Sequence, residues 1–299
     1  MVTGATSGIC LATARDLARR GATVIVVGRN ADRGRHATEE IRRVTGNPSV
    51  EWLAADLSSQ AEVRSLAQEF LVRHRRLDVL INNAGALYAF FQESVDGIEM
   101  TLALNHLGPF LLTSRLLDAL AAAAPSRIVN VSSAAHEDVD GFDFDDPQAA
   151  RRRGLGGYPR SEFASTFYSL ALPWAHPGFL QYARTKLANC LFTIELARRL
   201  GGTGVTANAL DPGLVASNFS GGNGVYGWFM RRYVGLRGIG VEAGAATTIH
   251  LATSKDVEQI SGRYFLKCQP SRCSDAAKDT VAAARLWTLS EDLTRASLT

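Results

Sequence analysis

The chain of 299 residues is long enough for one large domain or two small ones. Its 46% hydrophobic residues can fill a substantial core, and its 20% charged residues exclude a wholly disordered protein. The formal net charge of +3 is too small to indicate nucleic acid as a partner, so we expect none.

Short aliphatic strands alternate with helical patterns along the chain. We expect strands at 24–27, 50–56, 77–85, 127–133, 204–213 and 261–266. Helical patterns cover 11–21, 31–45, 59–74 and 181–200, and another helix begins near Gly97. The strands are apolar along their whole length, which is typical of a sheet with helices on both faces. The pattern predicts an α/β fold with a doubly wound, parallel, Rossmann-type sheet, and residues 1–299 as a single domain.

The turn before the first helix is rich in glycine. The chain opens MVTGATSGIC, so only Met1 and Val2 precede this turn as a possible strand. Gly4 and Gly8 allow backbone N–H groups to approach an anion, and the positive end of the helix dipole faces the same spot. A single glycine-rich turn is a weak signal, but the strand–turn–helix–strand context favours a phosphate-binding site.

The sequence contains neither a signal peptide nor an apolar segment long enough to span a bilayer, so we expect a cytoplasmic protein without a transmembrane segment. Cys10, Cys190, Cys268 and Cys273 lack metal-ligand spacing, and we expect no metal site. Reduced thiols are expected, with a loop disulfide between Cys268 and Cys273 as the alternative.

Two segments interrupt the alternation of strands and helices. An insertion at about 145–180 ends in an aromatic stretch, and a glycine-rich segment covers about 214–240. Both follow the carboxyl ends of predicted strands, where open α/β sheets bind ligands. We expect the second segment to form a substrate lid. We expect the insertion to form a wall of the substrate pocket, with Trp174 or Phe179 as its best-placed contact; packing on the outer surface or on a partner subunit is the alternative.

Tyr182 and Lys186 are four residues apart on a predicted helix and therefore share one of its faces. A phenol with its ordinary pKa of about 10 transfers a proton poorly at neutral pH. A nearby ammonium favours the phenolate and lowers that pKa, so the pair is a candidate general acid or base. Such a pair on its own is more often a surface feature.

Several motifs accompany this pair in a fixed order. They are TGATSGIC, NNAG at 82–85, Asn105 in LNHLG, Ser133 at the end of IVNVSS, YARTK at 182–186 and DPG at 211–213. The ordered set resembles the short-chain dehydrogenase/reductase family over almost the whole chain. The segments RIVNVSSAAH, FDFDD, YARTKLANCLFTIELARRL and GVEAGAATTIHLAT are similar to its retinol dehydrogenase-like branch. These motifs are specific for fold and cofactor class, and much less so for substrate.

The resemblance implies catalytic roles for four residues. Tyr182 would give a proton to a carbonyl oxygen as hydride arrives, or take it back in the reverse direction. Lys186 would hold the nicotinamide ribose and lower the pKa of Tyr182. Ser133 would hydrogen-bond the substrate oxygen, where charge develops, and Asn105 would hold a water that links Lys186 to solvent. The alternatives are a loop-capping hydroxyl for Ser133 and an amide that satisfies the backbone at a helix kink for Asn105.

The end of the second strand bears on the choice between NAD and NADP. An acidic residue there binds the ribose 2′-hydroxyl of NAD, whereas an arginine suits the 2′-phosphate of NADP. No carboxylate follows Arg29 until Asp32, so the sequence favours NADP(H), with Arg29 paired to the phosphate. A solvent-exposed arginine in a turn is the alternative. The resemblance implies further cofactor contacts from Gly4, Thr6, Ser7, Gly8, Ile9, Asp56, Leu57, Asn83, Ala84, Gly85, Tyr182, Lys186, Pro212, Gly213, Val215 and Ser217.

Three features depart from the family pattern. Cys10 replaces the third glycine, which normally allows helix, strand and cofactor to pack closely, so we expect weaker cofactor binding. The first strand, central in such sheets, is nearly missing, and either a misassigned or a truncated chain start would account for it. Tyr182 lies much farther beyond Ser133 than the family pattern places it, so the insertion must loop out before QYARTK.

We therefore expect an NADP(H)-dependent oxidoreductase that acts on a bulky, apolar carbonyl or alcohol. The resemblance also implies a homodimer or homotetramer. One alternative keeps the fold and cofactor but reduces a carbon–carbon double bond or epimerises its substrate. Another is a non-catalytic NADP(H)-binding protein, which cofactor turnover with a panel of ketones and aldehydes would distinguish. The sequence identifies neither the substrate nor the physiological direction.

Overall fold

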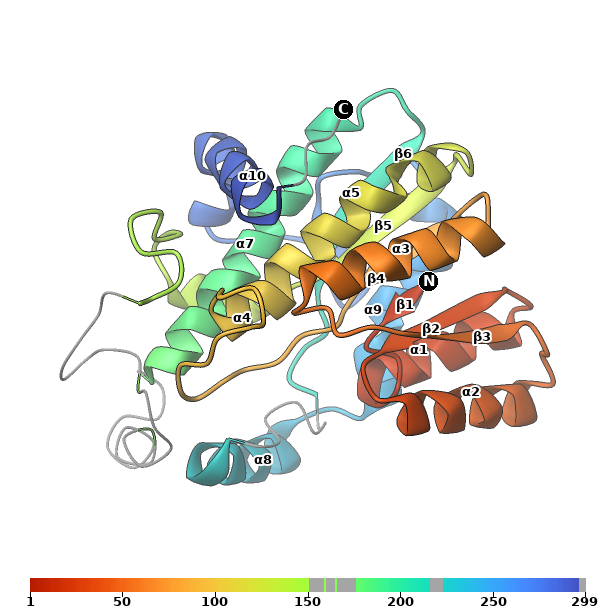
Figure 1. Cartoon of the computed structure of the whole chain (residues 1–299), viewed down its shortest axis with the longest axis horizontal. Helices are drawn as coiled ribbons and strands as arrows, with labels where there is room; N and C mark the ends of the chain where they lie inside the picture. The colour runs from red at the N-terminus through yellow and green to blue at the C-terminus, as the bar shows by residue number, and fades with distance from the viewer. Residues whose placement is uncertain (151–158, 160–164, 166–175, 216–222, 296–299) are drawn as a thin grey trace.

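An eight-stranded sheet forms the centre of the protein (Figure 1). The structure is a computed structural model that describes residues 1–150, 159, 165, 176–215 and 223–295. The strand order is β3-β2-β1-β4-β5-β6-β7-β8, and neighbouring strands are parallel except for the antiparallel β7–β8 pair. The strands are β1 (Val2–Thr3), β2 (Val24–Gly28), β3 (Val50–Ala54), β4 (Val79–Asn82), β5 (Ser126–Val131), β6 (Val205–Asp211), β7 (Tyr264–Leu266) and β8 (Gln269–Ser271).

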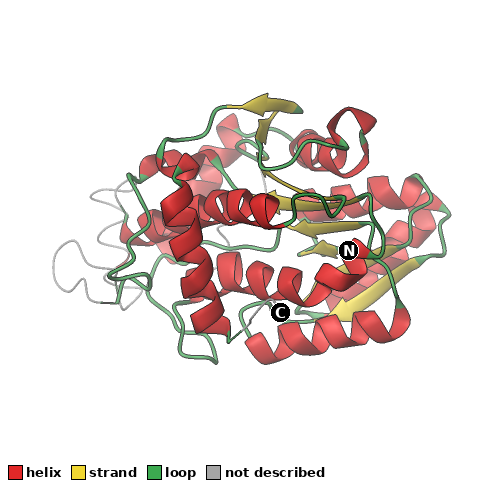
Figure 2. Ribbon diagram, turned by 90° about the horizontal axis from the view of Figure 1, so that it is seen from above, coloured by secondary structure: helices red, strands yellow, loops and turns green. Residues whose placement is uncertain are grey.

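Helices enclose the sheet in two layers (Figures 1 and 2). The longer ones are α1 (Gly8–Arg19), α2 (Ala31–Thr45), α3 (Gln60–Arg73), α5 (Gly108–Ala121), α7 (Pro177–Arg199), α8 (Gly224–Arg237), α9 (Val241–Thr253) and α10 (Thr280–Thr294). The short ones are α4 (Met100–Leu102), the π-helix η1 (Ala103–Leu107), and the 3₁₀ helices η2 (Ala134–Asp138), η4 (Lys255–Val257) and η5 (Ala276–Lys278). α3, α5 and α7 cover one face, and α1, α2 and α9 cover the other. The predicted doubly wound α/β fold is confirmed.

Local signals explain where the helices begin and end. The side chain of Asn30 accepts from Arg33 N to cap α2, and Gly46 ends that helix in the left-handed region with φ 72°. α7 starts earlier than the predicted residue 181, because His176 accepts from Gly178 N and Pro177 occupies the first turn. The end of the expected insertion is therefore helical, while most of the insertion, including Trp174, lies outside the described residues.

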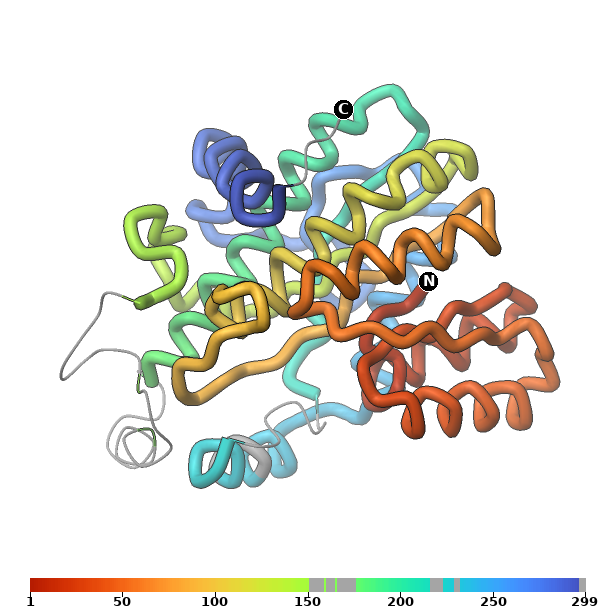
Figure 3. Tube along the Cα trace, viewed as in Figure 1, coloured from red at the N-terminus to blue at the C-terminus, as the bar shows by residue number. Residues whose placement is uncertain are grey.

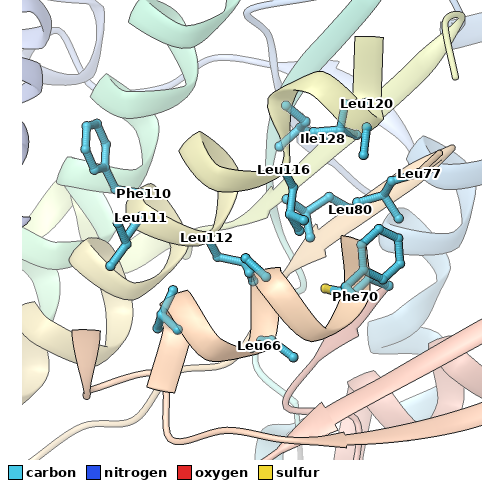
Figure 4. Close-up of a cluster of buried hydrophobic side chains, with 14 of the residues drawn as sticks. Leu66, Phe70, Leu77, Leu80, Phe110, Leu111, Leu112, Leu116, Leu120 and Ile128 are labelled. Carbon is cyan, nitrogen blue, oxygen red and sulfur yellow. The ribbon is translucent and has the colours of Figure 1, made fainter. Parts of the chain in front are cut away.

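The largest apolar cluster fills the space between the sheet and the layer of α3 and α5 (Figure 4). Leu66 and Phe70 of α3 meet Leu112 and Leu116 of α5, and all four are at most 2% exposed. Burial of each such side chain stabilises the fold by about 1.5–3 kcal/mol. This packing holds the carboxyl edge of the sheet in place.

β1 is short yet lies between β2 and β4 in the sheet, and the N-terminal residues lie in the middle of the molecule (Figure 3). Val2 pairs with both Val26 and Ile81, and Thr3 pairs with Val27. The Thr3 hydroxyl adds a bond to Ile81 O at 3.1 Å. This short strand delivers the glycine-rich turn to the centre of the sheet edge.

The indole of Trp52, on β3, lies between the sheet and α2. A Cβ at Gly34 would come within 2.3 Å of this indole, and one at Gly28 within 3.4 Å. Only glycine at position 34 therefore lets α2 lie directly against the ring, and the same indole borders the end of β2.

All four cysteines carry free thiols. Within the described ranges, no helix combines the length and apolar character needed to cross a membrane. Across those same ranges, no cluster of histidine, cysteine and acidic side chains could hold a metal ion.

Candidate active site

The turn between β1 and α1 forms a cradle from the predicted cofactor residues Gly4, Thr6, Ser7, Gly8 and Ile9. Gly4 has φ 72°, and a Cβ there would lie 3.1 Å from Ala84 Cα, so the turn packs closely on the loop after β4. In this described segment the N-cap Ser7 makes no side-chain cap bond, and the first turn of α1 has no acidic residue. The leading N–H groups of α1 therefore fit a phosphate group of a bound ligand.

Cys10 lies beside Asn83, one of the predicted cofactor residues. Asn83 Nδ2 donates to Cys10 Sγ, and the cysteine is only 6% exposed. Burial raises the pKa of this thiol to about 12, although the Asn83 bond acts in the opposite direction. Cys10 is therefore a neutral thiol at physiological pH and ties α1 to the loop after β4. The weaker cofactor binding expected from it stays a prediction.

Arg29 and Asp56 meet at the ends of β2 and β3. Arg29 Nη1 lies 4.0 Å from Asp56 Oδ2, and the arginine side chain is 69% exposed. Asp56 Oδ1 accepts from Ser58 N and Oγ at 2.9 and 2.7 Å, which fixes the carboxylate. Tyr88 also hydrogen-bonds Arg29. Sequence reasoning missed Tyr88, because nothing in the residues after NNAG indicates a contact with a distant strand end.

Leu57, another predicted contact, is buried beneath the start of α5. A Cβ at Gly108 would lie 2.2 Å from Leu57 O, so a side chain at position 108 would clash with this loop. The backbone after β3 and the first turn of α5 are thus held at a fixed distance.

Asn105 lies in the π-helix η1 and fastens the loop that contains Gly85. Its Oδ1 accepts from Ala86 N and its Nδ2 donates to Ala86 O, both at 2.9 Å. The same Nδ2 donates to Thr185 Oγ1 at 3.0 Å. A Cβ at Gly85 would lie 3.0 Å from Asn105 Oδ1 and 3.7 Å from Lys186 Nζ. The amide therefore satisfies the backbone of the loop after β4 rather than that of its own helix, and the water expected at Asn105 stays a prediction.

Thr3 of β1, which sequence reasoning did not single out as functional, holds Asn83 and Ala84 of the loop after β4 in place. Thr3 Oγ1 accepts from Asn83 N at 3.0 Å and from Ala84 N at 3.1 Å. This one hydroxyl therefore joins the end of β1 to the loop after β4.

Ser133, Tyr182 and Lys186 meet where β5 faces α7. Ser133 follows β5, and its Oγ accepts from Ala135 N at 3.2 Å, as the loop-capping interpretation predicts. The Ser133 hydroxyl is also hydrogen-bonded to the Tyr182 phenol. Lys186 Nζ lies 5.4 Å from the centroid of the Tyr182 ring and donates to Val131 O at 3.0 Å. The structure thus brings the three predicted residues together.

Burial dominates the electrostatics of this group. It raises the pKa of Tyr182 above its ordinary value, while the bond from Ser133 acts in the opposite direction. The net shift is opposite to the expected lowering, because the phenol is only 8% exposed and its burial is the largest cause, while the effect of Lys186 itself stays a prediction. Burial also lowers the pKa of Lys186 to about 8. Tyr182 is thus a neutral phenol beside a cation at pH 7.

The loop after β6 closes the cradle from the other side. Pro212 precedes Gly213, which has φ 82° and donates from its N to Asp211 Oδ1 at 2.8 Å. A Cβ at Gly244 of α9 would lie 2.5 Å from Val215 Cγ2 and 3.4 Å from Ile9 Cγ1. The predicted contacts Ile9 and Val215 therefore lie on the same side of α9. Ser217 lies outside the described residues.

His136 supports Ser133 from behind, a role that sequence reasoning missed. His136 Nδ1 lies 2.7 Å from Ser133 O, and Nε2 accepts from Ser274 N at 3.2 Å. These contacts fix the tautomer with its proton on Nδ1. The signal was available, because this histidine ends the RIVNVSSAAH segment.

An apolar cluster surrounds Tyr182 on its open side. Its members are Leu87, Ala89, Ala135, Ala183 and Tyr226, with Val139 and Phe179 packed on its edge. The ring centroids of Phe179 and Tyr182 are 6.3 Å apart. Asn223, the N-cap of α8, accepts from Ala89 N at 2.9 Å and donates to Leu87 O at 2.7 Å. This amide fastens α8, part of the expected lid segment, to the loop after β4.

Comparisons with known proteins agree with this arrangement. The profile of the short chain dehydrogenase family matches residues 1–141. Mouse retinol dehydrogenase 11 is 38% identical over 293 residues, which cover 98% of this chain and 85% of that protein. The crystal structure of an uncharacterized protein from Mycobacterium paratuberculosis is 33% identical, with a TM-score of 0.73 over 99% of this chain and 93% of that one. A variant of actinorhodin polyketide ketoreductase, solved with NADPH, shares the fold at 21% identity, with a TM-score of 0.63 over 88% of this chain and 93% of that one.

The sheet order and the residues gathered at its carboxyl edge are those of a nicotinamide-dependent oxidoreductase. The chain belongs to the short-chain dehydrogenase/reductase family, in its retinol dehydrogenase-like branch. The resemblance seen in the sequence is confirmed. Members of this family bind NAD or NADP.

Proposed function

We propose that this protein is an NADP(H)-dependent oxidoreductase that interconverts carbonyl and alcohol groups in bulky, apolar small molecules. The observation that carries the proposal is the group of Ser133 with the buried Tyr182 and Lys186, beside the glycine-rich cradle. A phenol hydrogen-bonded to a hydroxyl, with an ammonium beneath its ring, is suited to proton transfer at a carbonyl oxygen.

The chain's own residues divide the work of such a reaction. The reduced nicotinamide, when bound, supplies a hydride to the carbonyl carbon. The Tyr182 phenol donates its proton to the carbonyl oxygen, and the Ser133 hydroxyl donates a second hydrogen bond to the same atom. The Lys186 ammonium, 5.4 Å from the ring centroid, stabilises the phenolate that remains. His136 is a positioning residue, because it holds the backbone of Ser133.

Arg29 supports NADP(H) over NAD(H). It is a largely exposed cation directly after β2, and its position suits a ribose 2′-phosphate. The cradle made by Gly4 and the uncapped start of α1 suits the pyrophosphate, and the close approach at Gly85 suits the ribose next to Lys186.

Apolar neighbours of Tyr182 support an apolar substrate. Leu87, Ala89, Ala135 and Phe179 belong to or pack on the apolar cluster that contains the phenol, which suits a hydrocarbon body around one reactive oxygen. A wall from the insertion and a lid from 214–240 belong to the same proposal. The cytoplasmic location and the homodimer or homotetramer expected from the sequence stay predictions.

Tyr182→Phe tests the proposed chemistry. The variant should lose nearly all NADPH-dependent turnover of a ketone and aldehyde panel, because no other group donates the proton, while NADPH affinity should stay within about threefold of wild type. Tyr233→Phe, the same change on α8, is the control and should turn over normally. Wild-type turnover by Tyr182→Phe would refute the assignment, and a wild-type protein that binds NADPH but reduces nothing would favour a non-catalytic binding protein.

A further inference from the structure

The hydroxyl of Tyr226 on α8 is buried and unpaired among the residues that the structure describes. Tyr226 is 1% exposed, and its hydroxyl oxygen has no hydrogen-bond partner among the described residues. A hydroxyl removed from water without compensation destabilises a protein, so a native protein that keeps one needs a reason. Of the described side chains with such an unpaired atom, Tyr226 is the one that belongs to the cluster around Tyr182.

The polar groups next to Tyr226 have other partners. The ring of His176 lies 4.6 Å from that of Tyr226, but its Nδ1 accepts from Gly178 N and its Nε2 faces Ser165 Oγ at 3.2 Å. Both polar atoms of the Asn223 amide are bonded to the backbone of the loop after β4. These neighbours fix the Tyr226 ring without satisfying its oxygen.

Neighbouring contacts hold Tyr226 in place. Asn223 fastens the start of α8, and Tyr226 follows it by three residues, so the phenol is held against Leu87 and Ala89 in the cluster that contains Tyr182. The two phenols are close enough for Tyr226 to act electrostatically on Tyr182. Burial raises the pKa of Tyr226, so its hydroxyl keeps its proton and can donate it in a hydrogen bond at physiological pH.

The reacting oxygen does not need Tyr226. A carbonyl oxygen has two lone pairs, and in the proposed function Tyr182 and Ser133 take both. A third donor in the same apolar cluster suits a different oxygen. We propose that Tyr226 binds a second oxygen of the substrate, a hydroxyl, ether or further carbonyl, and so selects apolar carbonyl compounds that carry such a group over those that do not. This inference rests on the proposed function, since it assigns a contact within the same site.

A set of matched ketones tests the selection. Benzylacetone is the parent, and its ortho-, meta- and para-hydroxyphenyl derivatives place one extra oxygen at three different distances from the ketone. In wild type, at least one derivative should exceed the parent in kcat/KM by roughly three- to tenfold, the value of one hydrogen bond. Tyr226→Phe should bring that ratio back to about one, and any effect of the variant on Tyr182 cancels in the ratio because it changes kcat/KM of the parent and of the derivatives alike. Tyr233→Phe should keep the wild-type ratio.

The unfolding temperature separates this role from a structural one. Because the hydroxyl has no partner in the described part of the chain, Tyr226→Phe should not lower the unfolding temperature, whereas loss of an internal bond would lower it. A lowered unfolding temperature, a ratio unchanged by Tyr226→Phe, or no preference in wild type would each overturn the inference. Absence of turnover with every compound would instead count against the proposed function; the same ratio is then read from dissociation constants of the four ketones with NADPH present.

Discussion

Replacing Arg29 by aspartate should reverse much of the expected preference for NADPH over NADH. A hydrogen bond between charged groups contributes about 1.5–3 kcal/mol, and the 69% exposure of Arg29 places it near the lower end of that range. The new carboxylate adds about 1 kcal/mol of repulsion against a phosphate at a distance of roughly 4 Å in water. Since about 1.4 kcal/mol is a factor of ten, the preference should shift by roughly 50- to 100-fold.

The assay compares kcat/KM for NADPH and NADH at a saturating ketone concentration, together with both dissociation constants. Arg43→Asp changes the same charge in the last turn of α2 and controls for the general field of the protein. The ratio should change only in the Arg29 variant, and mainly through loss of NADPH affinity. An unchanged ratio would refute the reasoning and identify Arg29 as a surface residue that contacts Asp56 and Tyr88 without a role in cofactor choice.

Three further variants and two measurements on the wild type extend these tests. Gly108→Ala should lose about 1–3 kcal/mol of stability in urea unfolding, because its Cβ would lie 2.2 Å from Leu57 O, whereas Gly235→Ala, with no atom within 4 Å, should lose none. Burial lowers the pKa of Lys186 from 10.5 to about 8. Between these two pH values the unfolded chain therefore binds more protons than the folded chain, so the free energy of unfolding should rise with pH by up to about 3 kcal/mol. The Lys186→Met variant should lack this rise. A rise as large as that of the wild type would show that another group binds the protons. Light scattering at micromolar concentration should report a dimer or tetramer, and a monomer would contradict the expected assembly.

Helices and strands with clear local signals, such as capping residues, could be predicted from the sequence, and those without such signals could not. Asn30 and Gly46 bracket α2, and its predicted range of 31–45 matches the structure. The start of α7 was placed too late because the residues before Gln181 have the aromatic character of the insertion. β8 was missed altogether, since its three exposed residues have no apolar pattern and depend on β7 for their pairing. The π-helix η1 around Asn105 was not predicted, because a single wider turn within a helical pattern has no sequence signal of its own.

The candidate site also has a part that the sequence predicts and a part that depends on the fold. Ser133, Tyr182 and Lys186 could be chosen from the sequence because the family motifs mark them. The direction of the pKa shift at Tyr182 could not, because it depends on how completely the fold removes water from the phenol. The contacts of Tyr88 with Arg29 and of Asn223 with Leu87 join segments far apart in the chain, and no local pattern encodes them.

The position of Trp52 gives the protein an internal optical probe. Its indole is confined between the sheet and α2 beside Gly28, directly before Arg29. A ligand that occupies this end of the sheet changes the surroundings of the indole, and a reduced nicotinamide absorbs light at the wavelengths where tryptophan emits. Quenching of intrinsic fluorescence therefore follows cofactor binding without a label, and the difference between wild type and Trp52→Phe isolates the contribution from this end of the site.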